Sequence, residues 1–323
     1  MRVFVTGGTG FVGAHLVQAL GRRGDDVTAL VRNPAKAEAL GWRNVRIVRG
    51  DLDDAAALRA GAAGAEIVYH VAGRISARDL DDFMRANRNG TERVLEAVGR
   101  GEGPARFVLV SSIAAAGPTQ PGHPIDESRV PAPVTDYGRS KLAAELLVRQ
   151  AACPWTIMRP VVVYGEWDRE ILKVFRVARR GFAPVFGRGE QEISVIYAGD
   201  LAEALIAAGT SPAAAGRTYF AAHPQIVTTR QFSVAIGGAV GREVRIIGVP
   251  RLLARAALWT IGSAAHLVGA TTVLSGDKAN EFLAPAWTCR VDAMRQDTGW
   301  SATTTLTSGL ARTAAWYREK GWL

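Results

Sequence analysis

A glycine-rich turn near the start of the chain, TGGTGFVG at residues 6–13, limits the folds that this sequence can adopt. It follows the apolar run Val3-Phe4-Val5, which predicts a buried strand, and it precedes residues 11–20, whose apolar spacing predicts a helix. This order is the context of a dinucleotide-binding turn, although a tight loop in a chain with 35 glycines is the alternative. Glycines let the backbone approach a pyrophosphate, and the helix N-terminus offers it free amides. The cofactor contacts predicted here are Gly7, Gly10, Phe11, Val12 and Gly13.

Strand-like and helix-like stretches alternate as far as about residue 165. This alternation, with right-handed crossovers, predicts an α/β fold with a Rossmann-type doubly wound parallel sheet, which binds ligands at the carboxyl ends of its strands. We expect residues 1–165 to form the NAD(P)-binding domain, with residues 193–222 returning to it. Beyond these the pattern is mixed, so we expect residues 166–323 to form mainly a smaller substrate-binding lobe.

The ends of the second and third predicted strands concern the choice of cofactor. Arg32 stands where a carboxylate often binds the adenosine ribose, and a cation there suits a 2′-phosphate. The sequence therefore favours NADP(H) over NAD(H), with Lys36 assisting, although Arg32 could also be an ordinary surface arginine. Asp51 could accept a hydrogen bond from the adenine amino group or cap the next helix. The other contacts predicted at strand ends are Leu52, Val71, Ala72 and Gly73.

Tyr137 and Lys141 are four residues apart, so they lie one turn apart on the same face of a predicted helix. Ser112 ends the preceding strand, 25 residues before Tyr137, so the three side chains can converge above the sheet at a nicotinamide. A free tyrosine has a pKa near 10, and we expect the charges of Lys141 and an oxidised nicotinamide together to lower it by roughly three units. A half-buried aromatic residue and a helix-capping serine are the structural alternatives.

These motifs together resemble the extended short-chain dehydrogenases/reductases, a group with NAD(P)-dependent epimerases, dehydratases, dihydroflavonol reductases and 3β-hydroxysteroid dehydrogenases. The resemblance spans essentially the whole chain. It rests on TGGTGFVG (6–13), GDL (50–52), HVAG (70–73), NRNGT (87–91), LVSS (109–112), YGRSK (137–141), RPVVVYG (159–165), IYAGDLAEA (196–204), DTGW (297–300) and GLARTAAWYREKGWL (309–323).

The resemblance also implies a role for each matching residue. Tyr137 would be the catalytic acid/base, Lys141 its activator and Ser112 the hydrogen-bond donor to the substrate oxygen, with Ser111 as the second choice. Asn87 would belong to the proton-relay region. The residues that would border the nicotinamide are Pro160 and Val163.

Departures from the family patterns narrow the reaction. The dehydratase pattern has an Asp-Glu pair just after the catalytic hydroxyl residue. This chain has Ile-Ala-Ala there, at residues 113–115. Val162 and Ile193 stand where many sugar-nucleotide enzymes have Asn and Arg, so a diphosphate there would meet apolar walls. We therefore expect a carbonyl reductase or alcohol dehydrogenase for a hydrophobic or aromatic substrate. A sugar-nucleotide epimerase and a non-catalytic dinucleotide-binding protein are the alternatives. We expect the cleft to be lined partly by residues 252–274, Phe175, Phe182 and Phe186.

Composition sets the remaining expectations. The net charge is +9, but the 39 basic residues are scattered, which argues against a nucleic-acid partner. Two cysteines, no metal-spaced Cys/His cluster and no charged-then-apolar leader predict a cytoplasmic protein without a metal site. The apolar run 256–274 is borderline for a membrane span. We favour packed helices over interfacial membrane contact, to which Arg251 and Arg255 would contribute, and leave a homodimer open.

Overall fold

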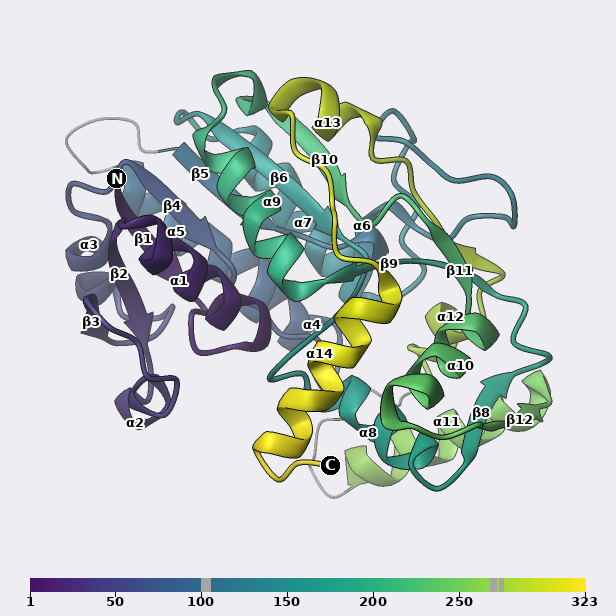
Figure 1. The fold of residues 1–323 in the computed structure, drawn as a ribbon. Helices are drawn as coiled ribbons and strands as arrows, with labels where there is room; N and C mark the ends of the chain where they lie inside the picture. The colour runs from purple at the N-terminus through teal and green to yellow at the C-terminus, as the bar shows by residue number, and fades with distance from the viewer. Residues whose placement is uncertain (100–105, 268–271, 273–275) are drawn as a thin grey trace.

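The computed structural model describes residues 1–99, 106–267, 272 and 276–323 (Figure 1). A seven-stranded, fully parallel sheet forms its centre. Its strands are β1 (Arg2–Thr6), β2 (Asp26–Val31), β3 (Val45–Arg49), β4 (Ile67–His70), β5 (Arg106–Val110), β6 (Trp155–Pro160) and β10 (Arg217–Ala221). The spatial order is β10-β6-β5-β4-β1-β2-β3, which confirms the predicted Rossmann-type sheet. The order reverses between β1 and β4, so the crevice for a ligand opens there.

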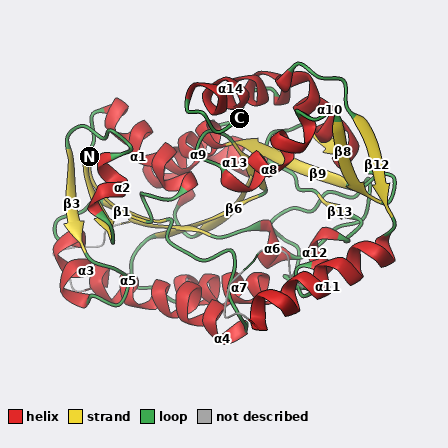
Figure 2. Cartoon of the chain, turned by 90° about the horizontal axis from the view of Figure 1, so that it is seen from below, coloured by secondary structure: helices red, strands yellow, loops and turns green. Residues whose placement is uncertain are grey.

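Helices cover both faces of this sheet, as Figure 2 shows. α1 (Phe11–Arg23) and α9 (Ala198–Thr210) lie on one face, and α3 (Ala55–Ala62), α5 (Gly90–Gly99) and α7 (Asp136–Arg149) lie on the other. Alternate residues of β1 serve the two layers: Val3 and Val5 pack in the core with α1 and α9, and Phe4 packs in the core with α3, α5 and α7. This two-residue period buries both faces and fixes the register of the strand.

A second region follows residue 160. Its small sheet contains β7 (Val162–Tyr164), β9 (Glu192–Tyr197), β11 (Ile226–Thr228) and β13 (Ala286–Trp287), while β8 (Phe182–Phe186) pairs with β12 (Arg245–Val249). Its helices are α8 (Arg169–Ala178), α10 (Thr229–Val240), α11 (Arg251–Leu267), α12 (Ala279–Phe282), α13 (Asp292–Thr298) and α14 (Leu306–Glu319). Segment 193–222 is shared between the sheets, because β9 lies in the small one and β10 in the main one. The domain boundaries stay a prediction.

The helical segment that contains Asn87 is interrupted in the structure. It consists of α4 (Leu80–Phe83), a π-helical turn (Met84–Asn89) and α5. A π turn inserts an extra residue and so rotates the side chains that follow it. Asn87 lies in this turn and is only 1% exposed. The interruption therefore accompanies the burial of a polar residue that the sequence marked as functional.

The apolar run 256–274 is only partly visible, because residues 268–271 and 273–275 lie outside the described residues. None of the helices in the described ranges is long and apolar enough to cross a membrane. The expected place of Phe175 in a cleft lining is wrong, because Phe175 is buried in the core. Leu252, Leu253, Trp259 and Phe182 are exposed, and their place in a cleft stays a prediction. α11 has apolar residues on most of its circumference, and its contact with the lobe covers only one side.

Candidate active site

The glycine turn after β1 is sterically demanding. Gly7 has φ 76°, and a Cβ there would lie 2.5 Å from the Ala72 amide nitrogen. A Cβ at Gly13 would lie 2.1 Å from the Gly7 carbonyl oxygen. Gly10 donates its amide to that same oxygen at 2.9 Å and caps α1 without a side chain. The turn therefore forms a cradle that side chains would fill. α1 begins with Phe11 and Val12, and the free amides of its first turn can bind a dinucleotide phosphate.

The backbone that follows β4, at residues 71–73, lies beside two of the catalytic residues predicted from the sequence, Asn87 and Lys141. Val71 and Ala72 are half-buried, and Gly73 is exposed. A Cβ at Gly73 would lie 3.0 Å from Asn87 Oδ1 and 3.6 Å from Lys141 Nζ. Since Gly7 touches Ala72, four separate segments converge on the crevice between β1 and β4. This is where ligands bind in such sheets.

The residues predicted to contact the adenosine end lie at the neighbouring strand ends. Arg32 directly follows β2 and Lys36 lies in α2 (Pro34–Glu38), and both are exposed. Asp51 follows β3, and its side chain accepts a hydrogen bond from the Asp53 amide at 2.8 Å. Leu52 is half-buried and packs beside Gly90, whose Cβ would lie 2.8 Å from Leu52 Cδ1. The two cations are thus free of steric cover, while Asp51 has a local structural role.

A close approach of two helices brings Ser112 and Tyr137 together. Thr135 caps α7 by accepting the Gly138 amide at 3.1 Å, which places Tyr137 in the first turn. A Cβ at Gly138 would lie 2.4 Å from the Ala114 carbonyl oxygen, so only glycine permits this approach. Ser112 caps the short helix α6 (Ile113–Ala116), and its hydrogen bond with Tyr137 lowers the pKa of the phenol.

Burial dominates the ionisation of both helix residues. It raises the pKa of Tyr137 to about 12; the Ser112 hydrogen bond opposes this rise, and the Glu281 charge adds to it. Burial lowers the pKa of Lys141 to about 8, partly opposed by Glu145. Lys141 Nζ donates to the Val110 carbonyl at 2.6 Å. The expected lowering of the tyrosine pKa needs the nicotinamide charge as well as Lys141 and stays a prediction. In this structure burial dominates the Tyr137 pKa, and the Lys141 ammonium faces a backbone oxygen.

Asn87 joins two parts of the site through its side-chain amide. Its Oδ1 accepts from the Arg74 amide at 2.8 Å, and its Nδ2 donates to the Arg74 carbonyl at 3.1 Å and to Ser140 Oγ at 2.9 Å. Ser140 directly precedes Lys141, so Asn87 couples the backbone after Gly73 to α7. In this structure it positions both segments, and its place in a proton relay stays a prediction.

The two candidate serines have different surroundings. Ser111 Oγ donates to Glu145 Oε1 at 2.6 Å, and Glu145 forms a buried ion pair with Arg159 at 2.7 Å. Ser111 is thereby part of a buried network, whereas Ser112 is half-buried beside the phenol of Tyr137. The geometry favours Ser112 as the serine that meets a substrate.

The two residues expected beside the nicotinamide lie at the end of β6 and in β7. Pro160 is the last residue of β6 and is buried, and Val163 is half-buried in β7. β6 pairs with β5, and Ser112 lies just after the end of β5. Pro160 ends β6, and Val163 follows shortly after it. They therefore lie at the carboxyl edge of the sheet, as the remaining predicted contacts do.

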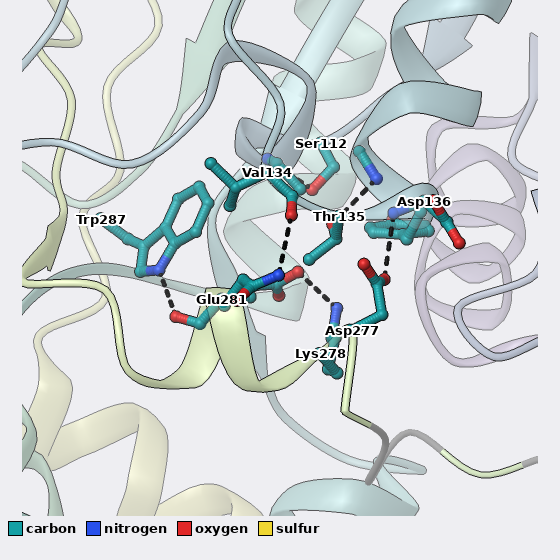
Figure 3. A network of polar contacts seen from close by, with 12 residues as sticks. Ser112, Val134, Thr135, Asp136, Asp277, Lys278, Glu281 and Trp287 are labelled. Carbon is teal, nitrogen blue, oxygen red and sulfur yellow. Dashed lines mark hydrogen bonds and ion pairs between the residues drawn. The ribbon is translucent and has the colours of Figure 1, made fainter. Parts of the chain in front are cut away.

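The sequence carries no signal for one further segment of the site. Residues 277–281, in the second region, face the start of α7. Lys278 Nζ lies 4.7 Å from the centre of the Tyr137 ring and pairs with Glu281 at 2.6 Å. Asp277 accepts the Asp136 amide at 3.0 Å, and Figure 3 shows this segment opposite the start of α7. Asp277 and Asp136 are 141 residues apart, so no local spacing signals the contact.

Comparisons with known proteins agree with this geometry. Residues 3–222 match the NAD dependent epimerase/dehydratase family. The chain is 33% identical over 326 residues to a "Ceramide reductase" from Caulobacter vibrioides, covering 99% of this chain and 96% of the relative. It is 32% identical to a "4-hydroxy-2-methyl-3-oxo-4-farnesyl-3,4-dihydroquinoline-1-oxide ketoreductase" from Stigmatella aurantiaca, covering 92% and 96%.

Among solved structures, MoeE5 in complex with UDP-glucuronic acid and NAD has a TM-score of 0.78 at 24% identity, covering 99% of this chain and 100% of that one. This likeness concerns the fold. The sheet order, the glycine cradle and the family match over two thirds of the chain lead to the same assignment. The chain belongs to the NAD dependent epimerase/dehydratase family of extended short-chain dehydrogenases/reductases.

Proposed function

We propose that this protein is an NADP(H)-dependent carbonyl reductase or alcohol dehydrogenase that acts on a hydrophobic substrate. The observation that carries the proposal is the Ser112–Tyr137 hydroxyl pair, with Lys141 one helical turn further on, at the edge of the sheet where the glycine cradle opens. Two adjacent hydroxyl groups can bind one carbonyl oxygen, and one of them can supply a proton to it.

Each residue has a distinct task in this proposal. The bound nicotinamide supplies or accepts the hydride. Ser112 holds the substrate oxygen, and Tyr137, whose pKa is raised to about 12, stays protonated and can donate a proton to the developing alkoxide. Lys141 lies close to the Gly73 backbone and can hydrogen-bond the cofactor ribose. Exposed Arg32 at the end of β2 supports a preference for NADP(H), because a cation there suits a 2′-phosphate.

The names of the relatives support a ketone on an apolar skeleton. They include the ceramide reductase, the farnesyl quinoline-oxide ketoreductase and a "2-alkyl-3-oxoalkanoate reductase" from Stenotrophomonas maltophilia, 26% identical over 340 residues. In this chain, Ile193 is buried in β9 and Val162 is half-buried in the adjacent β7. Aliphatic side chains at these positions do not provide ligands for a sugar-nucleotide diphosphate.

The test is an NADPH-oxidation assay against a homologous series of 3-oxo compounds, with a uridine-diphosphate sugar as the control. We expect kcat/KM to rise with apolar chain length, by about fourfold for each methylene that becomes buried. Tyr137→Phe should lower turnover by about 10²–10⁴-fold while leaving cofactor affinity largely intact.

Three results would overturn the proposal. Conversion of the sugar nucleotide without added cofactor, together with a flat response to ketone chain length, would favour an epimerase. Parent-level turnover by Tyr137→Phe would remove Tyr137 from the chemistry. A protein that binds NADPH but reduces no ketone of the series would favour a non-catalytic dinucleotide-binding protein.

A further inference from the structure

α11 presents large apolar side chains to solvent. Leu252 is 83% exposed, Leu253 64% and Trp259 65%. Of the α11 side chains that the structure describes, Ala254 and Leu258 are buried, and they pack against Ala279 and Leu283 of the α12 region. Figure 2 shows α11 at the outer edge of the molecule, beside α12.

The exposed residues share one side of the helix. At 3.6 residues per turn, Leu252, Ala256 and Trp259 are spaced i, i+4 and i+7, and Leu253 flanks them. Ala254 and Leu258 occupy the opposite side, which packs on the protein. α11 thus leaves large apolar side chains exposed on the side that the protein does not cover. An exposed apolar stripe such as this one on α11 indicates an interaction site.

The charges on α11 itself have one sign. Residues 251–267 contain two arginines and no acidic residue. Arg251 donates to the Leu283 carbonyl, whereas Arg255 is exposed beside the stripe. The strand before α11 adds exposed Arg245 and Ile247, and the whole chain has a net charge of +9. Leucine and tryptophan together with arginine, without carboxylates, are typical of helices that lie in the interface of an anionic bilayer.

This chemistry fits a lipid surface better than a second copy of the chain. In a twofold contact each stripe would face its own copy, so both Arg255 side chains would approach a region without an acidic partner on α11. Anionic headgroups supply the missing charge, and the headgroup boundary accommodates a tryptophan ring.

We propose that α11 docks on the surface of an anionic lipid bilayer, with Leu252, Leu253 and Trp259 entering the headgroup boundary and Arg255 contacting lipid phosphates. The buried side of α11 is linked to the candidate active site by a chain of contacts: α11 packs on α12, and Lys278, just before α12, lies over the Tyr137 ring. Docking would bring the catalytic residues near a source of apolar substrate. The interaction itself goes beyond the proposed function and does not depend on it.

The test is co-sedimentation of the full chain with vesicles of phosphatidylcholine and phosphatidylglycerol in equal parts, compared with phosphatidylcholine alone. We expect binding to the anionic vesicles that weakens in high salt. Leu253→Ser/Trp259→Ser should lower the partition coefficient at least about tenfold, and Arg255→Gln should lower it for anionic vesicles only. The matched control is Val130→Ser/Leu146→Ser, which removes two apolar side chains exposed elsewhere, 80% and 53%, and should bind as the parent does.

Three results would overturn the proposal: no sedimentation with anionic vesicles, equal loss in the control variant, or a dimer in solution that Leu253→Ser/Trp259→Ser dissociates while vesicle binding is absent. Sedimentation needs neither substrate nor cofactor. Failure of the lipid interaction would therefore leave the reductase proposal standing, and absence of ketone reduction would leave the lipid interaction standing.

Discussion

Burial of Lys141 predicts how the free energy of unfolding depends on pH, and this prediction does not involve any substrate. Lys141 is 5% exposed, and its ammonium group has the Val110 carbonyl as a hydrogen-bond acceptor. Burial lowers the pKa of Lys141 from 10.5 to about 8. In the unfolded chain the same group keeps its proton up to about pH 10.5. Between these two values the unfolded state binds more protons than the folded state, so Lys141 makes stability increase as the pH rises.

The magnitude follows from the two pKa values. The full difference is worth about 3 kcal/mol, and about 2 kcal/mol of it is realised between about pH 7 and about pH 9.5. Lys141→Met removes the titrating group and keeps a side chain of similar length. Any change in its bond to Val110 on losing the proton is already contained in the folded-state pKa, and the effects of the substitution that do not depend on pH cancel in the comparison.

The assay is urea unfolding of the parent protein and of Lys141→Met, each at about pH 7 and about pH 9.5, without cofactor. We expect the parent to gain about 2 kcal/mol relative to the variant on going to the higher pH. Lys320→Met, at an exposed lysine, is the control and should follow the parent. If the difference between parent and Lys141→Met were the same at both pH values, the lysine would not carry the burial cost that the structure indicates.

Three further predictions follow from the same site. Gly13→Ala would place a Cβ 2.1 Å from the Gly7 oxygen and should cost about 1–3 kcal/mol in urea unfolding and weaken cofactor binding in calorimetry, whereas Gly21→Ala, in open space on the same helix, should do neither; equal effects would contradict the steric argument. Asn87→Leu removes three hydrogen bonds and should destabilise by about 2–4 kcal/mol in urea unfolding, and a change within about 0.5 kcal/mol would refute its positioning role. Arg32→Asp should narrow or reverse a preference for NADPH over NADH in calorimetric titration, and equal affinities in the parent would exclude the phosphate contact.

The sheet and its glycine turn could be predicted because their signals are local. A buried parallel strand is a short apolar run, and the turn after β1 needs glycines where the backbone touches Ala72 and itself. The one-turn spacing of Tyr137 and Lys141 is likewise a property of any helix, so both residues could be placed on one face before the fold was known.

Other features depend on contacts between distant segments. The π turn at Asn87 forms where its amide meets Arg74 and Ser140, the latter 53 residues away. The raised pKa of Tyr137 depends on burial and on Glu281, and a sequence does not state how deeply a side chain lies. The unpartnered side of α11 has the same origin: apolar periodicity shows that a helix has apolar sides, but only tertiary packing decides which of them the protein covers and which it leaves to solvent.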